Sequence, residues 1–313
     1  MARGLPRGVR LNRTGRFAPS PTGVLHLGNL RTALLAWLYA RAQGAAFLLR
    51  VEDLDAGRVR AEHEARQLAD LAAIGLDWDG EVVRQSARTA LYADAVARLD
   101  AGGLVYPCWC TRREIREAAS APHGELPEGA YPGTCRRLGA AERAEREASG
   151  RPPALRVDAG AARMAFEDRV HGAQEGLVDD FVVRRNDGAF AYNLAVVVDD
   201  GDQGVGEVVR GDDLLDSTPR QLWLARRLGL PAPSFAHVPL VLGEDGARLA
   251  KRHGAVTLED RMALGETPDG VRARLAASVG LCGPDERPAP GDLVARFDPD
   301  AFRPPPAGPL PGL

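Results

Sequence analysis

The pattern of apolar and polar positions in the N-terminal third of the chain predicts strands that alternate with helices. Gly15–Ala18 predicts the end of a short strand, and Phe47–Val51 is an apolar run of strand length. Leu30 and Leu34 recur at helical spacing, so we expect a helix that begins near Gly28. Two further helices are expected, at Ala61–Ile74 and Thr89–Ala101. This order is typical of a parallel α/β sheet.

The pattern breaks at residue 104 and resumes near residue 186. Residues 104–185 hold three of the four cysteines and an Arg/Glu-rich helical pattern near Ala140–Ala148, which indicates an inserted module. After it, the continuous apolar run Tyr192–Val198 predicts a strand that ends in two aspartates. The later expected elements are a helix at Thr218–Leu228, a strand at His237–Leu242, helical structure from Val256, and a disordered Pro-rich tail over Arg303–Leu313.

These segments predict a doubly wound parallel sheet whose two halves are separated by the module. We expect the first half at residues 1–103, the module at 104–185 and the second half at 186–255. Residues 256–313 would form a short helical C-terminal region with the Pro-rich tail. A chain of 313 residues can bury a large core without disulfides.

Composition excludes several classes of protein. No apolar run approaches the length of a membrane span, and the five arginines among the first 16 residues do not accompany the apolar segment of a secretory signal. We therefore expect a cytoplasmic protein without a membrane partner, and a monomer. The net charge of −3 excludes a general polycation but not a local nucleic-acid site. Of the 40 basic residues only Lys251 is lysine, which makes that position a candidate for function.

The loop after the first expected strand has the features of a phosphate site. Pro19 and Gly23 force an irregular turn, and Gly28 allows close backbone approach at the start of the helix. A helix N-terminus at the carboxyl end of a strand offers free N–H groups and a positive dipole end to phosphate. His26 adds a side-chain donor for charge that grows on a phosphoryl group, although a lone histidine there can also be structural.

The string Arg16-Phe17-Ala18-Pro19-Ser20-Pro21-Thr22-Gly23, followed by His26-Leu27-Gly28-Asn29, resembles the signature of class I aminoacyl-tRNA synthetases of the glutamyl branch. The resemblance runs from about residue 13 to 262 and implies their Rossmann-like fold. One position departs from the signature, because Asn29 stands where the family motif ends in histidine. The resemblance implies that ATP contacts Pro19, His26, Gly28, Asn29 and Lys251, with His26 and Lys251 catalytic and Mg²⁺ bound with the ATP.

A glutamate ligand has one ammonium group and two carboxylates, so its site needs an acid and preferably two arginines. Arginine binds carboxylate through two parallel hydrogen bonds and disfavours the neutral amide of glutamine. Glu52 can hold the ammonium, Arg16 and Arg210 are candidates for the carboxylates, and Tyr192 can add a hydroxyl. Each of these side chains alone is also compatible with an ordinary structural role. The resemblance implies glutamate contacts at Arg16, Ser20, Glu52, Tyr192 and Arg210.

The segment Arg248-Leu249-Ala250-Lys251-Arg252 resembles the mobile lysine loop of the same family. The family motif has lysine and serine where this chain has Arg248 and Ala250, whereas the lysine expected at the ATP phosphates is retained as Lys251. A mobile ammonium can follow the departing pyrophosphate as negative charge accumulates on it.

Three cysteines inside the expected module have the spacing of a metal site. Cys108 and Cys110 are too close for an easy disulfide, and with Cys135 and one further donor they can form a tetrahedral zinc site. The fourth ligand can be Tyr131 or His123. Cys-x-Cys with Tyr-x-x-x-Cys resembles the site of one truncated subgroup, the glutamyl-queuosine tRNA(Asp) synthetases, which favours Tyr131 and one structural Zn²⁺.

The region that would read an anticodon in full-length glutamyl enzymes is not expected in the residues that follow the lysine loop. The resemblance to the truncated subgroup therefore implies a ligase that uses ATP to activate L-glutamate and attaches it to queuosine, the modified base in the anticodon arm of tRNA(Asp). Two other functions stay open at this point: a short enzyme that charges tRNA(Glu), and a non-catalytic RNA-binding paralogue. The paralogue would be expected to have lost Glu52, His26 or Lys251, and the chain keeps all of them.

Overall fold

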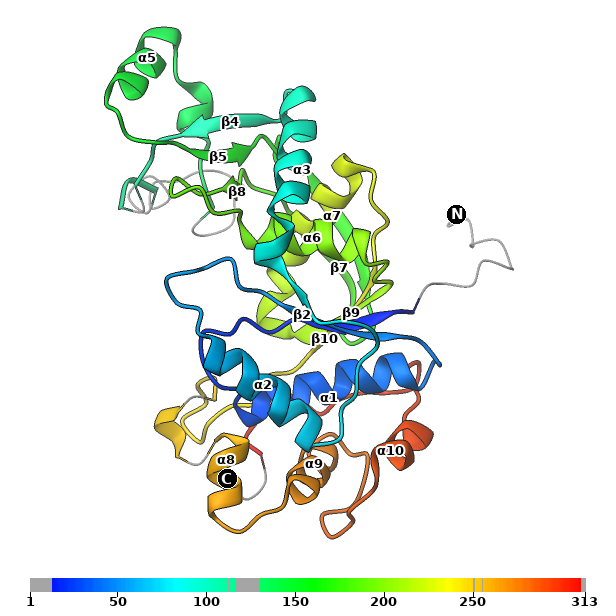
Figure 1. Cartoon of the computed structure of the whole chain (residues 1–313). Coiled ribbons are helices and arrows are strands. Elements are labelled where there is room, and N and C mark those ends of the chain that lie inside the picture. The colour runs from blue at the N-terminus through cyan, green and yellow to red at the C-terminus, as the bar shows by residue number, and fades with distance from the viewer. Residues whose placement is uncertain (1–12, 112, 116–129, 250, 255, 311–313) are drawn as a thin grey trace, which may run out of the picture.

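The computed structural model describes residues 13–111, 113–115, 130–249, 251–254 and 256–310. It shows an α/β body with a module of antiparallel strands at one end (Figure 1). The strands are β1 (Gly15–Phe17), β2 (Phe47–Val51), β3 (Val83–Arg84), β4 (Val105–Cys108), β5 (Ala154–Val157), β6 (Arg163–Asp168), β7 (Gly172–Leu177), β8 (Val182–Arg184), β9 (Glu207–Gly211) and β10 (Ser234–Val238).

The α-helices are α1 (Leu27–Arg41), α2 (Ala61–Ala73), α3 (Thr89–Ala101), α5 (Ala140–Ala148), α6 (Tyr192–Asp202), α7 (Thr218–Leu228), α8 (Leu258–Ala263), α9 (Pro268–Ala277) and α10 (Pro290–Arg296). Short 3-10 helices are η1 (Gln85–Arg88), η2 (Cys135–Arg137), η3 (Asp212–Ser217) and η4 (Lys251–His253). The helices expected around α1, α2, α3, α5 and α7 are confirmed, as are the strands β1 and β2.

Two parallel sets of strands form the centre of the body. β1, β2 and β3 pair in parallel, and β10 pairs in parallel with both β9 and β6. The backbone N–H groups of Gly206 and Glu207 donate to the carbonyl of Thr14, which joins the approach to β9 to the approach to β1. The strand order therefore reverses between β1 and β9. In doubly wound sheets ligands bind at this reversal, beyond the carboxyl ends of the strands.

Helix α1 is buried on nearly every side, with 12 of its 15 residues inaccessible to solvent. One side packs on the sheet, and the other packs on α9 and α10 through a shared apolar cluster that includes Leu275, Leu293 and Phe297. Tyr39 of α1 lies edge-on against Phe297, with 5.0 Å between the ring centroids. The helices of residues 256–310 are therefore part of the main core.

The strand predicted at Tyr192–Val198 is wrong, because these residues begin helix α6. Seven of the 11 residues of α6 are buried, between α3 and α7. A helix that is covered on most sides lacks the polar face that produces a 3.6-residue period, so a short apolar run does not distinguish it from a buried strand. Consequently, Asp199 and Asp200 point from a helix and do not mark the end of a strand.

The ends of two other predicted segments also differ from the structure. The strand predicted at His237–Leu242 is β10, which covers Ser234–Val238, and Val241 and Leu242 form only isolated bridges. The tail predicted to be disordered is ordered as far as residue 310: the carbonyl of Gly308 accepts from the N–H of Leu242, and Leu310 is 2% exposed. A proline-rich composition removes backbone donors, but carbonyls and apolar side chains can still pack.

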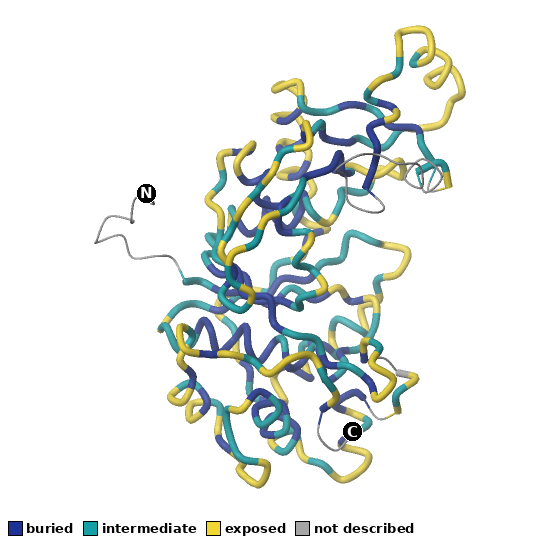
Figure 2. The backbone as a smooth tube through the Cα atoms, turned by 180° about the vertical axis from the view of Figure 1, so that it is seen from behind, coloured by how far each residue is buried: buried dark blue, intermediate teal, exposed yellow. Residues whose placement is uncertain are grey.

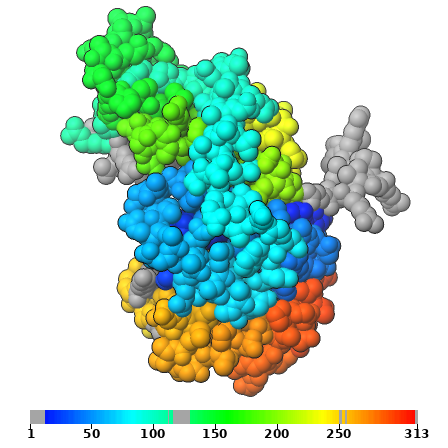
Figure 3. Space-filling view, in the orientation of Figure 1, coloured from blue at the N-terminus to red at the C-terminus, as the bar shows by residue number. Residues whose placement is uncertain are grey.

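Residues of the predicted module contribute to two different sheets. The antiparallel strands β4, β5 and β8 form the module itself, whereas β6 and β7 form a hairpin whose strand β6 continues the sheet of β9 and β10. Helix α5 lies at the tip of the module and has no buried residue (Figure 2). In the space-filling view the module projects at one end, and the C-terminal helices form the opposite end (Figure 3). Among the described helices, none combines the length and the apolar character of a membrane span.

Candidate active site

The loop between β1 and α1 is held by hydrogen bonds from the elements that follow it. The N–H of Glu52, at the end of β2, donates to the carbonyl of Pro19 at 3.0 Å. The buried amide of Gln67 on α2 donates to the carbonyls of Ser20 and Gly23, at 3.1 and 2.7 Å. The irregular turn is therefore fixed by a side chain that the sequence pattern alone did not identify.

His26 caps helix α1 together with Asn29. The ring Nδ1 of His26 accepts from the backbone N–H of Asn29, and the side-chain Oδ1 of Asn29 accepts from the backbone N–H of His26, both at 3.2 Å. Asparagine can complete this reciprocal cap with its short amide. With Nδ1 serving as an acceptor, the ring proton resides on Nε2, which becomes the donor available to a ligand.

The pKa of His26 is lowered from 6.5 to about 4. Burial of the ring is the main cause, and the positive charge of Arg248 is the second. The ring is therefore neutral at physiological pH, and Nε2–H donation does not depend on a proton that titrates between pH 5 and 8. Gly28 makes this arrangement sterically feasible. A Cβ added there would lie 3.0 Å from two atoms of the His26 ring and 3.3 Å from Val241.

A cavity of about 550 Å³ lies where the strand order reverses. Nine of the residues predicted to bind ATP or glutamate line it, although they come from six separate elements and loops. They are Arg16, Pro19, Ser20, His26, Gly28, Asn29, Glu52, Tyr192 and Arg210. The structure thus brings these predicted residues together, and their individual roles remain predictions.

The charged groups of this cavity are fixed by buried partners. Arg16 donates from Nε to Asp200 at 3.3 Å, and Arg50 donates to the same carboxylate oxygen at 2.8 Å. Arg50 also lies 3.5 Å from Glu52. Burial raises the pKa of Glu52, and the charges of Arg50 and then Arg16 oppose this rise. A ligand ammonium beside Glu52 would add a further positive charge and favour the carboxylate form.

Arg210 of β9 is the second buried arginine of the cavity, and it is 5% exposed. Its guanidinium donates to Gln221, Thr218 and the ring Nε2 of His237, at 2.7, 2.8 and 3.0 Å. The sequence did not identify Gln221 and His237 as partners of Arg210, or Asp200 as the partner of Arg16. A buried arginine within a strand needs hydrogen-bond acceptors, but the sequence does not show which distant residues supply them.

The two ends of the lysine loop lie beside the His26 cap. At the start of the loop, the N–H of Leu249 donates to the carbonyl of Val241, which also lines the cavity. After the loop, the carbonyl of Val256 accepts from the N–H of Leu27 at 2.7 Å. Arg248 pairs with Asp213 at 2.5 Å. Lys251 begins η4, but Ala250 and the side chain of Lys251 lie outside the described part of the chain.

A second cavity, of about 660 Å³, lies between the body and the module. Ser20, Glu52 and Tyr192 line both cavities, so the two meet at the predicted glutamate site. Its far side is formed by the module, including Cys108 and Cys110.

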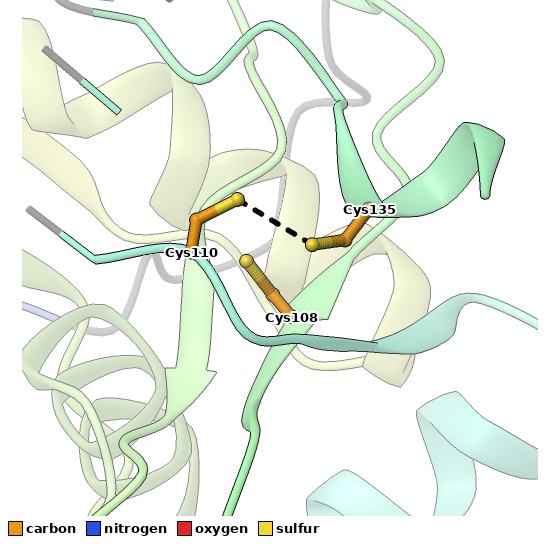
Figure 4. Close-up of side chains that lie close together, drawn as sticks. All are labelled: Cys108, Cys110 and Cys135. Atoms are coloured by element: carbon orange, nitrogen blue, oxygen red, sulfur yellow. Dashed lines mark hydrogen bonds between the residues drawn. The ribbon is translucent and has the colours of Figure 1, made fainter. Parts of the chain in front are cut away.

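The three cysteines of the module converge as the spacing predicted (Figure 4). The sulfur atoms of Cys108, Cys110 and Cys135 all lie within 4.8 Å of one another, a geometry that can hold one metal ion. The hydroxyl of Tyr131 lies 3.4 Å from the sulfurs of both Cys108 and Cys110. Hydrogen bonds from the Cys110 and Cys135 thiols lower the pKa of Cys108. The alternative ligand, His123, lies outside the described residues.

Arg156 of β5 closes one side of this cluster. Its Nε donates to the sulfur of Cys108 at 3.3 Å, and its guanidinium lies over the ring of Tyr131, 3.9 Å from the centroid. Thr111 and Glu114, just after Cys110, exchange backbone-to-side-chain hydrogen bonds and so form a capping box. Cys282 is half-buried and belongs to the apolar cluster of the body, away from the module.

Comparison with known proteins gives consistent matches. Residues 13–282 match the family model for the catalytic domain of class I tRNA synthetases (E and Q). A protein of Nocardia farcinica named glutamyl-Q tRNA(Asp) synthetase is 63% identical over 91% of this chain and 89% of its own length. One of the same name from Symbiobacterium thermophilum is 53% identical over 91% and 92%.

Among solved structures, the chain is similar to a glutamate tRNA ligase of Elizabethkingia meningosepticum, whose crystal structure is in complex with its amino acid. The TM-score is 0.80 at 26% identity, over 95% of this chain and 67% of that one.

We expect Gly28→Ala to destabilise the protein, although alanine is normally the better helix former. The added methyl group would displace the His26 ring and weaken the reciprocal cap, at a cost of about 1 kcal/mol in the free energy of unfolding. Urea denaturation measures this change.

Gly291→Ala is the matched control, because Gly291 is the second residue of α10 just as Gly28 is the second of α1, and a Cβ there meets nothing within 4 Å. It should be neutral or stabilising. Equal effects of the two substitutions would contradict the steric role of Gly28.

Proposed function

The chain belongs to the class I tRNA synthetases for glutamate and glutamine, and we propose that it activates L-glutamate with ATP and transfers it to queuosine of tRNA(Asp). The observation that carries the proposal is the charge arrangement in one cavity: two buried arginines, Arg16 and Arg210, and the carboxylate of Glu52. This set matches the charges of glutamate, and it lies beside a helix N-terminus suited to phosphate.

In the proposed binding mode Glu52 holds the ammonium of glutamate, and Arg16 and Arg210 hold the side-chain carboxylate. Ser20 and Tyr192 line the same part of the cavity and supply hydroxyl groups. Because both arginines are buried, a neutral glutamine amide would leave their N–H groups poorly paired, which favours glutamate.

The α-carboxylate of glutamate then attacks the α-phosphorus of ATP in line. A new carboxyl–phosphorus bond forms, the bond between the α-phosphorus and the bridging oxygen breaks, and pyrophosphate leaves with the bonding electrons. His26 donates its Nε2–H to the phosphate oxygens, where negative charge grows. Mg²⁺ bound with ATP supplies further charge neutralisation. Lys251 follows the departing pyrophosphate as the loop closes.

Transfer requires the acceptor to reach the carbonyl of the adenylate. The second cavity adjoins the first at Ser20, Glu52 and Tyr192, so it offers the acceptor nucleotide access from the side of the module. The nucleophile of the modified base attacks the carbonyl carbon, and AMP leaves. The relatives named glutamyl-Q tRNA(Asp) synthetase, at 46–63% identity over most of the chain, support this acceptor.

Zinc is the metal that best suits the cysteine cluster. Three thiolates with one oxygen donor favour a closed tetrahedral site, and the Tyr131 hydroxyl is close to two of the sulfurs. We assign Cys108, Cys110, Cys135 and Tyr131 as its ligands. The ion would stabilise the module by tying β4 to η2, without a part in the chemistry.

A second acceptor, tRNA(Glu), is suggested by the likeness to the glutamate tRNA ligase structure. Two measurements test the first proposal against it. The purified protein should exchange pyrophosphate into ATP with glutamate and without RNA. It should also transfer labelled glutamate to tRNA(Asp) that contains queuosine, and not to tRNA(Asp) lacking queuosine or to tRNA(Glu). Charging of tRNA(Glu) alone would establish the second acceptor, and absence of exchange both with and without RNA would exclude both enzymes.

Lys251→Ala should reduce glutamate-dependent pyrophosphate exchange at least ~100-fold, as expected when a key electrostatic donor is lost. Lys251→Arg should also be impaired, because a planar guanidinium cannot replace a compact, mobile ammonium. Arg248→Lys, which keeps the charge at a neighbouring position, is the matched control. An arginine variant with full activity would show that charge alone suffices at residue 251.

The protein as purified should contain one zinc ion per chain, and Cys135→Ser should lose it, which elemental analysis measures. Tyr131→Phe should release zinc to a chelator faster than the unaltered protein. Cys282→Ser is the control and should keep its zinc. Equal zinc content in the Cys135 and Cys282 variants would refute the assignment.

A further inference from the structure

A buried carboxylate and imidazole lie directly behind Arg210. Asp168, at the end of β6, is 1% exposed, and His237, in β10, is fully buried. The ring Nδ1 of His237 lies 2.7 Å from Oδ2 of Asp168. The other carboxylate oxygen, Oδ1, accepts from the backbone N–H groups of Val170 and His171 at 2.9 and 3.0 Å. The backbone N–H of His237 also lies 3.2 Å from Oδ2 and 3.3 Å from Oδ1, so four N–H groups surround the carboxylate of Asp168.

The direction of each hydrogen bond in this set is determined. Arginine has no acceptor, so the Nε–H of Arg210, 3.0 Å from the ring Nε2 of His237, must donate to it. Nε2 therefore carries no proton, and the proton of the neutral ring is on Nδ1, where it donates to Asp168. Two hydrogen bonds therefore connect Asp168 through His237 to Arg210, and we call this pair of bonds the relay.

The surroundings favour a neutral ring beside an ionised carboxylate. Burial lowers the pKa of His237, and the charge of Arg210 acts in the same direction against the opposing effect of Asp168. Burial alone would raise the pKa of Asp168, but hydrogen bonds from the His237 ring and then from the backbone at His171 and Val170 outweigh it, so that its pKa is lowered.

Other contacts hold the guanidinium of Arg210 from the remaining protein side. Gln221 and Thr218 accept from its two terminal nitrogens at 2.7 and 2.8 Å. Phe235 lies under it at 5.5 Å, and the same ring stacks on His237 with an interplanar angle of 11°. The relay thus fixes Nε, while Gln221 and Thr218 fix the rotation of the terminal N–H groups that border the cavity.

We propose that Asp168 and His237 are positioning residues for substrate binding, which hold Arg210 in the orientation that receives the side-chain carboxylate of glutamate. This inference rests on the proposed function. Neither residue lines the cavity, and both act on the ligand only through Arg210. The relay also connects β6 to the predicted glutamate site through β10 and β9.

Asp168→Asn tests whether Asp168 positions Arg210 or only fills space in the core. The substitution nearly preserves the shape of the side chain, but it reverses the direction of the hydrogen bond with the His237 ring. The N–H groups of Val170 and His171 favour an oxygen at the Oδ1 position, so the new NH₂ group would face both the ring Nδ1 and the backbone N–H of His237. The ring would then accept at Nδ1 and carry its proton on Nε2, directly opposite the Nε–H of Arg210. The new Nε2–H could donate to the hydroxyl of Thr218, 3.2 Å away, but the Nε–H of Arg210 would lose its acceptor, and Arg210 would move.

We expect Asp168→Asn to raise the KM for glutamate in pyrophosphate exchange about 10- to 100-fold, the range for loss of a hydrogen bond to a charged group. The KM for ATP should stay close to that of the unaltered protein, so that a selective rise in the KM for glutamate separates the effect on Arg210 from a general loss of stability. The control is Asp70→Asn, a buried carboxylate on α2 that accepts from Arg66 at 2.7 Å and does not line the cavity. It should leave the KM for glutamate unchanged.

His237 supplies a second, independent pair of variants. His237→Gln can place an amide oxygen where Nε2 accepts and should keep most glutamate affinity, whereas His237→Leu removes the acceptor and should not. In ¹⁵N NMR spectra of the labelled protein, the His237 ring should be protonated at Nδ1 in the unaltered protein and at Nε2 in Asp168→Asn.

The outcomes distinguish the inference from the function on which it rests. If the unaltered protein shows no glutamate-dependent exchange, the proposed function fails, while the NMR result still reports the tautomer. If exchange is normal but Asp168→Asn leaves the KM for glutamate unchanged, or raises both KM values together with a loss of thermal stability, Asp168 and His237 have only a structural role and the inference is overturned.

Discussion

The fully buried guanidinium of Arg50 is the constraint on which the rest of the site depends. It lies in β2 and donates to Asp200 and Gln203 of the region around α6, each at 2.8 Å. A buried charge is tolerated only with such partners, and removal of one partner of a buried pair typically costs about 3–5 kcal/mol. Asp200 in turn holds Arg16, so a single cation joins the two halves of the chain and orients a predicted ligand contact. The neighbouring Asp199 extends the network, because it accepts from Gln85, Arg88 and Tyr92.

Much of the fold could be predicted from local patterns, since β1, α1, β2, α2 and α3 have the expected periods or lengths. The failure at α6 has a physical cause: a helix buried on most sides shows no polar face, and its run of valines is equally suited to a strand. The prediction of a disordered tail was wrong because a high proline content indicates only that backbone donors are missing. It does not indicate whether a side chain such as Leu310 is buried. In both cases tertiary packing, which sequence windows do not contain, decided the outcome.

The candidate site, like the fold, could be predicted only in part from the sequence. Residues within motifs, such as His26, Glu52 and the three cysteines, could be selected from the sequence, because the motif itself carries the chemistry. The residues that fix them could not, since their partners lie far away in the chain: Asp200 is 184 residues from Arg16, and His237 is 69 residues from Asp168. The sequence showed only that a charged residue inside an apolar strand needs a hydrogen-bond partner, and not which residue it is. The sequence therefore indicated which groups meet the ligand, and the structure was needed to show what orients them.

The burial of α1 from both sides has a consequence for how the molecule can be divided. Apolar residues of α1, the helix that begins after the His26 cap, pack against α9 and α10, and Tyr39 packs on Phe297. A recombinant fragment that stopped after the lysine loop would keep most motif residues but open this face to water, and a contiguous apolar surface of that kind promotes aggregation. The smallest autonomous unit of this fold therefore extends well beyond its last motif. Efforts to transplant or shorten the activity would have to carry the C-terminal helices with it.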